Sequence, residues 1–271
     1  MNQIRLDLAL VERGLARSRN QAASLVESGR VFINGKEAKK SSQQVSPDLE
    51  IVVLQAEDYV SRAGHKLAQA LKEFKISVAG KLCLDVGAST GGFTDVLLKN
   101  NAQKVIALDV GHDQLSNSLL VDPRVINLEG VNARELTLAK LSNLSGLKLN
   151  QDSIEIVVAD LSFISLTLVL KQIVDVAPKA EIILLIKPQF EVGKNSLEAS
   201  GIVNDHRLRA LALRQVIDAA KQTGLGLHGL VKSPLPGTHG NQEYLAWFNA
   251  VETNWGIDWS GRIDELAKSK G

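Results

Sequence analysis

An acidic residue and a glycine-rich turn lie together in residues 81–94. An apolar run from residue 81 ends near Asp85 and is followed by Gly87, Gly91 and Gly92. The pattern predicts a buried strand, a tight turn and then a helix. Glycine in the turn permits positive φ and a close approach of backbone to ligand, and the first amides of the helix have no partner within it. The segment is therefore typical of a loop that holds a nucleoside-bearing cofactor at the carboxyl edge of a parallel sheet.

The spacing within this turn narrows the choice of cofactor. A dinucleotide site needs G-x-G-x-x-G, and Ser89 stands where the second glycine belongs, while a P-loop would need a lysine that this turn lacks. NAD and ATP are therefore disfavoured. A second acid, Asp109, ends the apolar run 104–109, where a ribose diol would lie. With Asp85 at the amino acid end, the pair fits S-adenosylmethionine, although an α/β turn with two incidental carboxylates would give the same pattern.

Two further charged residues end apolar runs. Asp160 ends the run 154–160, and Lys187 ends the run 181–187. Removing an ammonium group from water is costly unless a carboxylate lies beside it, so Asp160 is the expected partner of Lys187. Because the carboxyl ends of parallel strands meet at one edge of a sheet, we expect this pair beside the cofactor loop. A buried ion pair with a purely structural role would have the same sequence pattern.

The elements that would position these residues alternate between strand and helix. An amphipathic helix is expected over 61–74 and another over 205–223. The expected strands are 81–85, 104–109, 124–128, 154–160, 181–187, 225–231 and 243–248. This alternation, with nearly continuous apolar strands, predicts an α/β fold with a doubly wound parallel sheet, in the Rossmann-like manner.

Composition limits the class of protein. The chain of 271 residues is 45% hydrophobic with a formal net charge of +1, which suits one full α/β domain with a small module and leaves any nucleic-acid binding local. One cysteine, Cys83, excludes an internal disulfide and a thiolate zinc cluster, and the five histidines form no ligand-spaced set, so no metal is expected. No run approaches the roughly 18 apolar residues of a membrane span, and no secretory segment is visible. We expect a soluble, cytoplasmic protein.

Residues 1–40 carry the local positive charge, with eight lysines and arginines against four acids. Apolar residues at helical spacing predict helices over 4–14 and 18–29, each ending at a glycine. A hairpin follows, in which Asn34 and Gly35 form the preferred type I′ turn between 31–33 and 36–38. The first 40 residues therefore predict a small basic α+β module.

This order of elements resembles the RNA-binding domain named after ribosomal protein S4, over residues 4–53. The likeness rests on the residues from Arg5 to Asp7, the segment Gly14–Arg19 between the helices, and Gly29 to Val31 before the hairpin. Arginines beside the free amides of a helix N-terminus form a good phosphate site. The resemblance implies RNA contacts by Arg5, Arg17, Ser18, Arg19 and Gln21. A solvated basic face on a structural module is the alternative.

The remainder of the chain resembles the FtsJ-type RNA ribose 2′-O-methyltransferases, whose active residues run Lys, Asp, Lys, Glu. The matching residues are Lys66, Asp160, Lys187 in Lys-Pro-Gln-Phe, and Glu243 in Gly-Asn-Gln-Glu. Together with the S4-like module and the junction 61–66, the whole chain is similar to the TlyA family of bacterial rRNA methyltransferases, also known as haemolysin A. The resemblance implies methyl transfer from S-adenosylmethionine to a cytidine 2′-hydroxyl of ribosomal RNA, and the complete N-terminal helix favours the members that act on both subunits.

The implied chemistry needs these residue types. A ribose hydroxyl is a poor acid, so it needs a base, or a cation that stabilises its alkoxide, within about 3 Å. Lys187 is the candidate base; a second ammonium at Lys66 would favour its neutral form, whereas Asp160 would orient it and favour the charged form. Glu243 balances the charge and can bind ribose or Lys66. Which lysine takes the proton stays open.

The predicted site residues fall into three groups. Catalytic roles are predicted for Lys66, Asp160, Lys187 and Glu243. Cofactor contacts are predicted for Asp85, Gly87, Ser89, Gly91, Gly92, Phe93, Asp109, Val110, Asn132 and Asp160. Besides the N-terminal module, Arg62 and Phe190 are expected to meet RNA; Phe163 and Phe190 could each stack on a base or simply pack in the core. The polar stretch 191–201 is predicted to cover the RNA site, and 232–240 to position Glu243.

The sequence predicts an S4-like domain over 1–58, a linker over 59–64, a methyltransferase domain over 65–254 and a C-terminal tail over 255–271. The expected partner is ribosomal RNA or a ribosomal subunit, and the oligomeric state is open. Two alternatives belong to other classes. One is an RNA-binding protein with an inactive methyltransferase domain, against which the four filled catalytic positions argue. The other is a membrane-active haemolysin, which would need membrane-inserting segments that the sequence does not contain.

Overall fold

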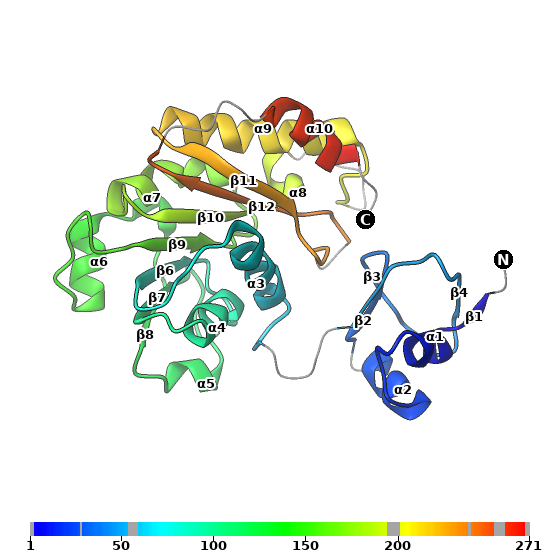
Figure 1. The fold of residues 1–271 in the computed structure, drawn as a ribbon. Helices are drawn as coiled ribbons and strands as arrows, with labels where there is room; N and C mark the ends of the chain where they lie inside the picture. The colour runs from blue at the N-terminus through cyan, green and yellow to red at the C-terminus, as the bar shows by residue number, and fades with distance from the viewer. Residues whose placement is uncertain are drawn as a thin grey trace. The chain divides into compact units, whose positions relative to one another are not determined.

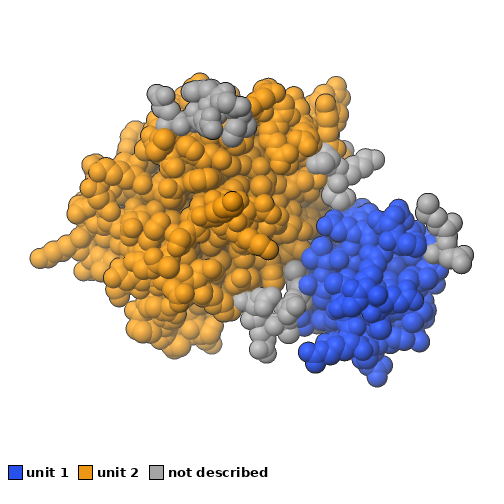
Figure 2. All heavy atoms as spheres, in the orientation of Figure 1, with its two compact units in different colours: residues 1–58, 271 blue, residues 59–270 orange. Residues whose placement is uncertain are grey.

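The computed structural model describes residues 3–27, 29–53, 59–193, 201–237, 240–251 and 258–268 (Figure 1). The chain forms two compact units, residues 1–58 with Gly271 and residues 59–270, coloured blue and orange in Figure 2. The predicted linker 59–64 belongs to the second unit, because Tyr59 and Val60 pack against its core and a helix begins at Ala63.

Unit 1 contains the predicted helices α1, Leu6–Glu12, and α2, Arg19–Glu27, followed by the hairpin of β2, Val31–Ile33, and β3, Lys36–Glu37. Asn34 and Gly35 have positive φ, as a type I′ turn requires. The sequence did not predict β5, Ile51–Val53, which pairs with β2, nor the two-residue strands β1, Ile4–Arg5, and β4, Gln44–Val45, which pair with each other. Strands of two residues are too short to give a period-2 signal.

Unit 2 is built on a seven-stranded sheet in the order β11-β12-β10-β9-β6-β7-β8. Its strands are β6, Leu82–Val86; β7, Lys104–Leu108; β8, Val125–Leu128; β9, Ile156–Ala159; β10, Glu181–Ile186; β11, Gly226–Lys232; and β12, Tyr244–Asn249. The neighbours from β10 to β8 are parallel, but β12 is antiparallel to both β10 and β11. The predicted parallel sheet is thus wrong at β12, because a short connection without a crossover helix can only join antiparallel neighbours.

Helices cover both faces of this sheet (Figure 1). One core contains residues of α3, Ala63–Phe74; α4, Gly92–Lys99; and α5, Asn117–Leu120. The other core contains residues of α6, Leu138–Ser145; α7, Leu170–Val176; α9, His206–Gln222; and α10, Trp259–Lys268. Successive side chains of a strand point to opposite faces, so strands covered on both faces are apolar throughout. This is the physical reason for the continuous apolar runs in the sequence.

The segment predicted as a C-terminal tail, 255–271, contains a helix. Residues 259–268 form α10, which packs along α9 and buries Ile263, Leu266 and Ala267 in the second core. These three residues stand at i, i+3 and i+4, so the helical signal was present in the sequence. The signal is weak because the segment is short and mostly polar.

Candidate active site

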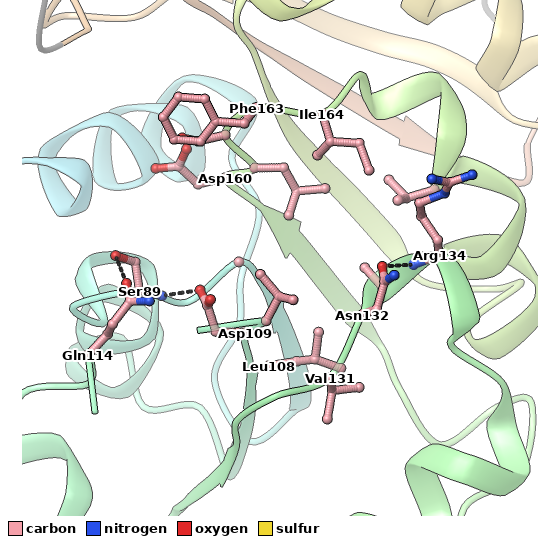
Figure 3. A pocket seen from close by; sticks show the side chains of 16 residues that line it. Ser89, Leu108, Asp109, Gln114, Val131, Asn132, Arg134, Asp160, Phe163 and Ile164 are labelled. Atoms are coloured by element: carbon pink, nitrogen blue, oxygen red, sulfur yellow. Dashed lines mark hydrogen bonds between the residues drawn. The ribbon is translucent and has the colours of Figure 1, made fainter. Parts of the chain in front are cut away.

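A cavity of about 540 Å³ opens beyond the carboxyl ends of the parallel strands (Figure 3). A smaller cavity of about 90 Å³ shares Gly87, Ser89 and Asp160 with it and adds Gly92 and Phe93. The predicted cofactor residues in the wall of the larger cavity are Gly87, Ser89, Asp109, Val110, Asn132 and Asp160. Figure 3 shows Asp109, Asn132 and Asp160 around it, each from the end of a different strand or its following loop. These residues meet here because the parallel strands end at one edge of the sheet.

The turn after β6 is held close to the loop after β9. Gly87 has a φ of +86°, and a Cβ at this position would lie 2.7 Å from the carbonyl oxygen of Asp160. Only glycine fits this approach, since any side chain would be both strained and in collision. The turn therefore depends on Gly87 to bring the cofactor loop against Asp160.

Asp109 organises the cavity wall through backbone donors. Its carboxylate accepts the amide of Ser89 at 2.8 Å and the amide of Gly111 at 2.7 Å. The Ser89 hydroxyl donates to Oε1 of Gln114 at 3.1 Å, and Gln114 also lines the cavity. The sequence patterns did not single out Gln114, because it lies in a loop with no spacing signal. Each carboxylate oxygen of Asp109 has lone pairs to spare for a ligand hydroxyl.

Two predicted cofactor residues, Asp85 and Gly91, line neither cavity. Asp85 is fully buried, and the hydroxyl of Thr94 donates to its carboxylate at 2.7 Å. Burial raises the pKa of Asp85 to about 7. Gly91, with φ of +96°, begins α4 and packs against Leu119. Both residues therefore shape the start of α4, and the predicted contact of Asp85 with a ligand finds no support in this placement.

Only part of the start of α4 faces a cavity. The amide of Asp95 donates to the carbonyl of Gly91 at 2.8 Å, and the amide of Thr94 bonds to Asp85. The earlier residues Gly92 and Phe93 lie in the wall of the smaller cavity. The ligand-facing part of the turn therefore ends one residue before Thr94.

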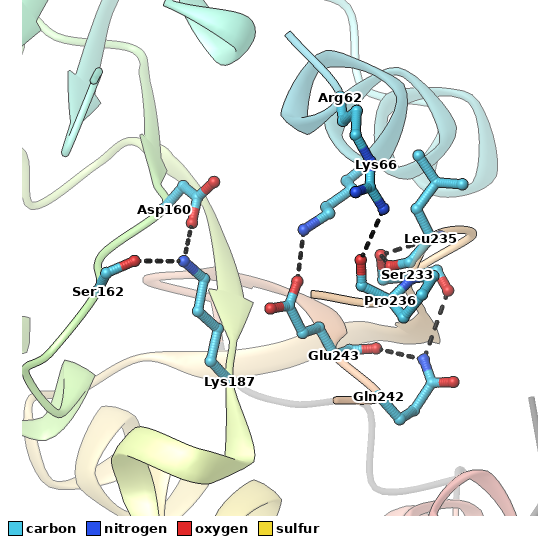
Figure 4. Close-up of polar contacts among 10 residues, drawn as sticks. All are labelled: Arg62, Lys66, Asp160, Ser162, Lys187, Ser233, Leu235, Pro236, Gln242 and Glu243. Atoms are coloured by element: carbon cyan, nitrogen blue, oxygen red, sulfur yellow. Dashed lines mark hydrogen bonds and ion pairs between the residues drawn. The ribbon is translucent and has the colours of Figure 1, made fainter. Parts of the chain in front are cut away.

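Lys187 and Asp160 form the ion pair that the sequence indicated (Figure 4). Lys187 follows β10, and its Nζ lies 2.6 Å from Oδ1 of Asp160, which follows β9. The same ammonium group donates to Oγ of Ser162 at 2.9 Å. The side chains are only 11% and 16% exposed, so water screens this pair weakly. Because Asp160 lines both cavities, the pair places the Lys187 amine beside the cofactor region.

Lys66 and Glu243 form a second buried ion pair. Nζ of Lys66, on α3, lies 2.5 Å from Oε2 of Glu243, which precedes β12, and the side chains are 9% and 2% exposed. Glycine at position 237 leaves space for the Glu243 carboxylate, since a Cβ there would collide with it. Figure 4 shows this pair beside the Lys187–Asp160 pair. The structure thus brings the four predicted catalytic residues together.

The two residues of unit 2 expected to meet RNA are already engaged within that unit. The guanidinium of Arg62 donates to the carbonyl of Pro236 at 3.4 Å and so supports the loop that precedes Glu243. Phe190 is half-buried, with its ring centroid 5.3 Å from that of Phe163. Phe163 is 92% exposed, has φ of +66°, and lines the larger cavity. Of the two aromatic residues, Phe163 is therefore the one available to a ligand. The predicted covering stretch 191–201 lies mostly outside the described residues.

In unit 1, Asp7 binds two of the predicted RNA-contacting residues. Arg5 and Arg19 lie 2.9 and 3.0 Å from its Oδ2. The hydrogen bond from Arg5, with that from Arg19, holds the pKa of Asp7 well below its usual range. One carboxylate cannot neutralise two guanidinium groups, so the cluster keeps a positive charge on a partly exposed surface.

The other predicted contacts of unit 1 lie at the start of α2. Arg17 and Ser18 are exposed. The amide of Arg17 donates to Oε1 of Gln21 at 2.6 Å, and the amide of Gln21 donates to the Ser18 hydroxyl at 3.2 Å. Gln21 and Ser18 thus fix the turn into α2, while the Arg17 side chain is presented at the surface.

The described part of the chain contains neither a metal-binding cluster nor a membrane-spanning helix. There, no group of three or more His, Cys, Asp or Glu side chains is arranged to hold a metal ion. Across the same residues, no helix has both the length and the apolar character to cross a membrane.

Known proteins match the chain over nearly its full length. It is 48% identical to the 16S/23S rRNA (cytidine-2′-O)-methyltransferase TlyA of Mycobacterium tuberculosis, covering 98% of this chain and 96% of that one. It is 40% identical to Hemolysin A of Brachyspira hyodysenteriae, over 90% and 99% of the two chains. A solved structure from Streptococcus thermophilus, whose name also carries the word hemolysin, superposes with a TM-score of 0.72 at 34% identity and covers 98% of this chain and 95% of that one.

Family comparisons divide the chain at the same place as the structure does. Residues 4–51 match the S4 domain, and residues 59–250 match the FtsJ-like methyltransferase domain. The chain therefore belongs to the FtsJ-like methyltransferase family, and within it to the TlyA group, in which an S4 domain precedes the methyltransferase domain.

Proposed function

We propose that this protein transfers a methyl group from S-adenosylmethionine to the 2′-hydroxyl of a cytidine in ribosomal RNA. The observation that carries the proposal is that Asp160 contacts both the cavities and Lys187. It lines both cavities and at the same time holds the Lys187 amine at 2.6 Å. A hydroxyl group that reaches a methyl donor in this cavity also comes within reach of a buried amine.

The cavity suits S-adenosylmethionine in size and in the chemistry of its walls. Its volume of about 540 Å³ lies within the usual range for small-molecule sites. The carboxylate of Asp109 can accept hydrogen bonds from ribose hydroxyls, and Val110 and Leu161 offer apolar surface to the adenine. Gly87 and Phe93 would border the amino acid end in the smaller cavity. When bound, the cofactor supplies a methyl group on a positively charged sulfur.

We assign the proton of the 2′-hydroxyl to Lys187. In its neutral form the amine takes that proton, and the carboxylate of Asp160 stabilises the ammonium group that forms. Ser162 accepts a hydrogen bond from the same nitrogen and fixes its direction. Lys66 and Glu243 bond to each other and not to Asp160, so we assign them to holding the ribose and balancing the charge. Of the two lysines, Lys187 is the one whose amine bonds to a residue of the cavity wall, and the assignment follows from this contact.

RNA binding is divided between the two units in this proposal. The exposed Arg17, with the charged cluster of Arg5 and Arg19, provides phosphate contacts in unit 1. In unit 2, the exposed ring of Phe163 beside the cavity is suited to stack on the base next to the reacting ribose. The Phe190 ring packs against that ring and is not itself the main contact.

We infer the substrate from the Mycobacterium tuberculosis relative, whose name specifies cytidine in 16S and 23S rRNA. A ribosomal substrate would place the protein in the cytoplasm. The test is to map 2′-O-methyl groups on ribosomal RNA from cells with the protein, without it, and with Lys187→Ala in its place. A methyl group present only with the wild-type protein supports the proposal. Identical maps from all three would refute it.

The competing functions are separated by two direct measurements. An RNA-binding protein with an inactive domain would not bind S-adenosylmethionine in a calorimetric titration, with or without RNA. A membrane-active protein, as the Brachyspira hyodysenteriae relative's name suggests, would release dye from lipid vesicles. We expect cofactor binding in the first measurement and no dye release in the second.

A further inference from the structure

Glu191 links the segment after β10 to the segment after β9. It ends α8, Pro188–Glu191, the single helical turn that begins directly after Lys187. Its Oε2 accepts the hydroxyl of Ser165 at 2.5 Å, and its Oε1 accepts the amide of Leu166 at 3.0 Å. Ser165 precedes a short 3₁₀ helix, η2, Leu166–Leu168. Glu191 thus satisfies the free donors at the start of a turn that belongs to another part of the chain.

This bond is the second of two that join the same segments. Nearer the cavity, Lys187 holds Asp160 and Ser162. Farther along, Glu191 holds Ser165 and Leu166. Residues 160–166 are therefore fixed at both ends by side chains four positions apart on one short segment. Between the two bonds lies Phe163 in a left-handed conformation, which an aromatic residue adopts only when its surroundings impose it.

The Glu191 carboxylate is partly removed from water, which disfavours its ionised form, but it accepts two hydrogen bonds, which favour that form. Burial raises the pKa of Glu191, while the bonds from Ser165 and Leu166 favour the ionised form and lower it. Hydrogen bonds to a carboxylate are about twice as strong as those between neutral groups. A chain that only needed to cap η2 already has the Ser165 hydroxyl, which accepts the amide of Thr167. The additional bonds from Glu191 are best explained by the alignment of residues 160–166 with Lys187.

We propose that Glu191 is a positioning residue for methyl transfer, which fixes residues 161–165 against Lys187 so that Asp160 and Ser162 hold its amine in place. It acts through these residues and does not touch the substrate. The inference rests on the proposed function and adds to it a residue outside the four catalytic positions.

The test compares Glu191→Ala with the conservative Glu191→Gln. The alanine removes both bonds, so we expect kcat for methyl transfer to fall about tenfold to a hundredfold, the usual range for residues that orient a reacting group, with KM for RNA and the Kd for S-adenosylmethionine nearly unchanged. Glutamine keeps an acceptor for the Leu166 amide and a polar group for Ser165, so most of the activity should return. Thr137→Ala is the matched control, because it removes the side-chain cap of α6, and neither Thr137 nor α6 lines a cavity, so kcat should stay intact.

A second measurement does not depend on activity. Amide hydrogen exchange of residues 161–166 should be faster in Glu191→Ala than in the wild type, and unchanged in Thr137→Ala. If Glu191→Ala fails to fold, Ser165→Ala removes one of the two bonds and should give the smaller effect in the same direction.

Two outcomes would overturn the inference: wild-type kcat in Glu191→Ala, or unchanged exchange in residues 161–166. Loss of activity in Glu191→Gln equal to that in Glu191→Ala would also count against it. Failure of the proposed function would look different, because the wild-type protein itself would then transfer no methyl group, while the exchange measurement would still report on the link.

Discussion

The carboxylate of Asp160 lies 2.6 Å from the amine of Lys187 and at the same time forms part of the wall of both cavities. A buried ion pair is weak evidence for stability, because desolvation offsets much of the attraction. Its position at the junction of the two cavities makes a role in chemistry the better explanation.

Replacement of Lys187 by alanine should lower methyl-transfer turnover by about two orders of magnitude or more, since a positioned base contributes roughly 10²–10⁴-fold. The Kd for S-adenosylmethionine should stay within a few-fold of the wild-type value, because Lys187 lines neither cavity. Single-turnover assays and calorimetry measure the two quantities separately. Nearly normal turnover in Lys187→Ala would show that the Lys187–Asp160 ion pair has only a structural role.

Gly87→Ala should abolish cofactor binding at ordinary concentrations. A methyl group there would collide with the Asp160 carbonyl, 2.7 Å away, and the backbone has φ of +86°. Gly146→Ala is the control, because Gly146 has φ of +70° but nothing within 4 Å of its Cβ position. It should cost about 1 kcal/mol of stability from backbone strain alone and leave cofactor affinity unchanged. Equal affinities for both variants would contradict the role given to Gly87.

Asp85 should make the protein less stable as the pH rises from about 4 to about 7. Burial raises the pKa of Asp85 from 3.8 to about 7, so the folded state binds this proton more tightly than the unfolded state. The penalty is absent below pH 4 and complete above pH 7, where it reaches about 4 kcal/mol at 1.36 kcal/mol per pKa unit. Urea unfolding across this range should give a flatter profile for Asp85→Asn. Parallel profiles for the two proteins would rule out an effect of Asp85.

Arg17→Ala should weaken RNA binding and flatten its salt dependence. Each lost phosphate contact removes roughly one unit from the slope of log K against log salt. Arg17 is the cleaner choice than Arg19, whose guanidinium also binds Asp7 and so supports the fold of unit 1. Arg207→Ala, which removes an exposed arginine paired with Asp205 in unit 2, controls for net charge. The same slope for Arg17→Ala and the wild type would show that this side chain does not contact RNA.

The sequence by itself predicted the elements whose signals are local. The hairpin at Asn34 and Gly35 follows from the preference of these residues for a type I′ turn. The strands of unit 2 follow from continuous apolar runs, which are typical of strands buried on both faces of a sheet. The pairing of Lys187 with Asp160 followed from the cost of burying a lone ammonium group. In each case the physical cause acts within a short segment, or on a single side chain.

Tertiary structure decided what depends on strand order and on contacts across the chain. Lys66 meets Glu243 across 177 positions because β12 enters the sheet antiparallel, beside β10, which no local pattern encodes. Asp85 lies in β6, one residue before its end, and its side chain is fully buried and bonded to Thr94 in the first turn of α4, because the packing of that helix encloses it. Gln114 lines the cavity from a loop, and Glu191 reaches Ser165 and Leu166 from the end of α8. Periodicity predicts which residues are buried in an element, but the neighbour of a side chain is fixed only when the elements pack together.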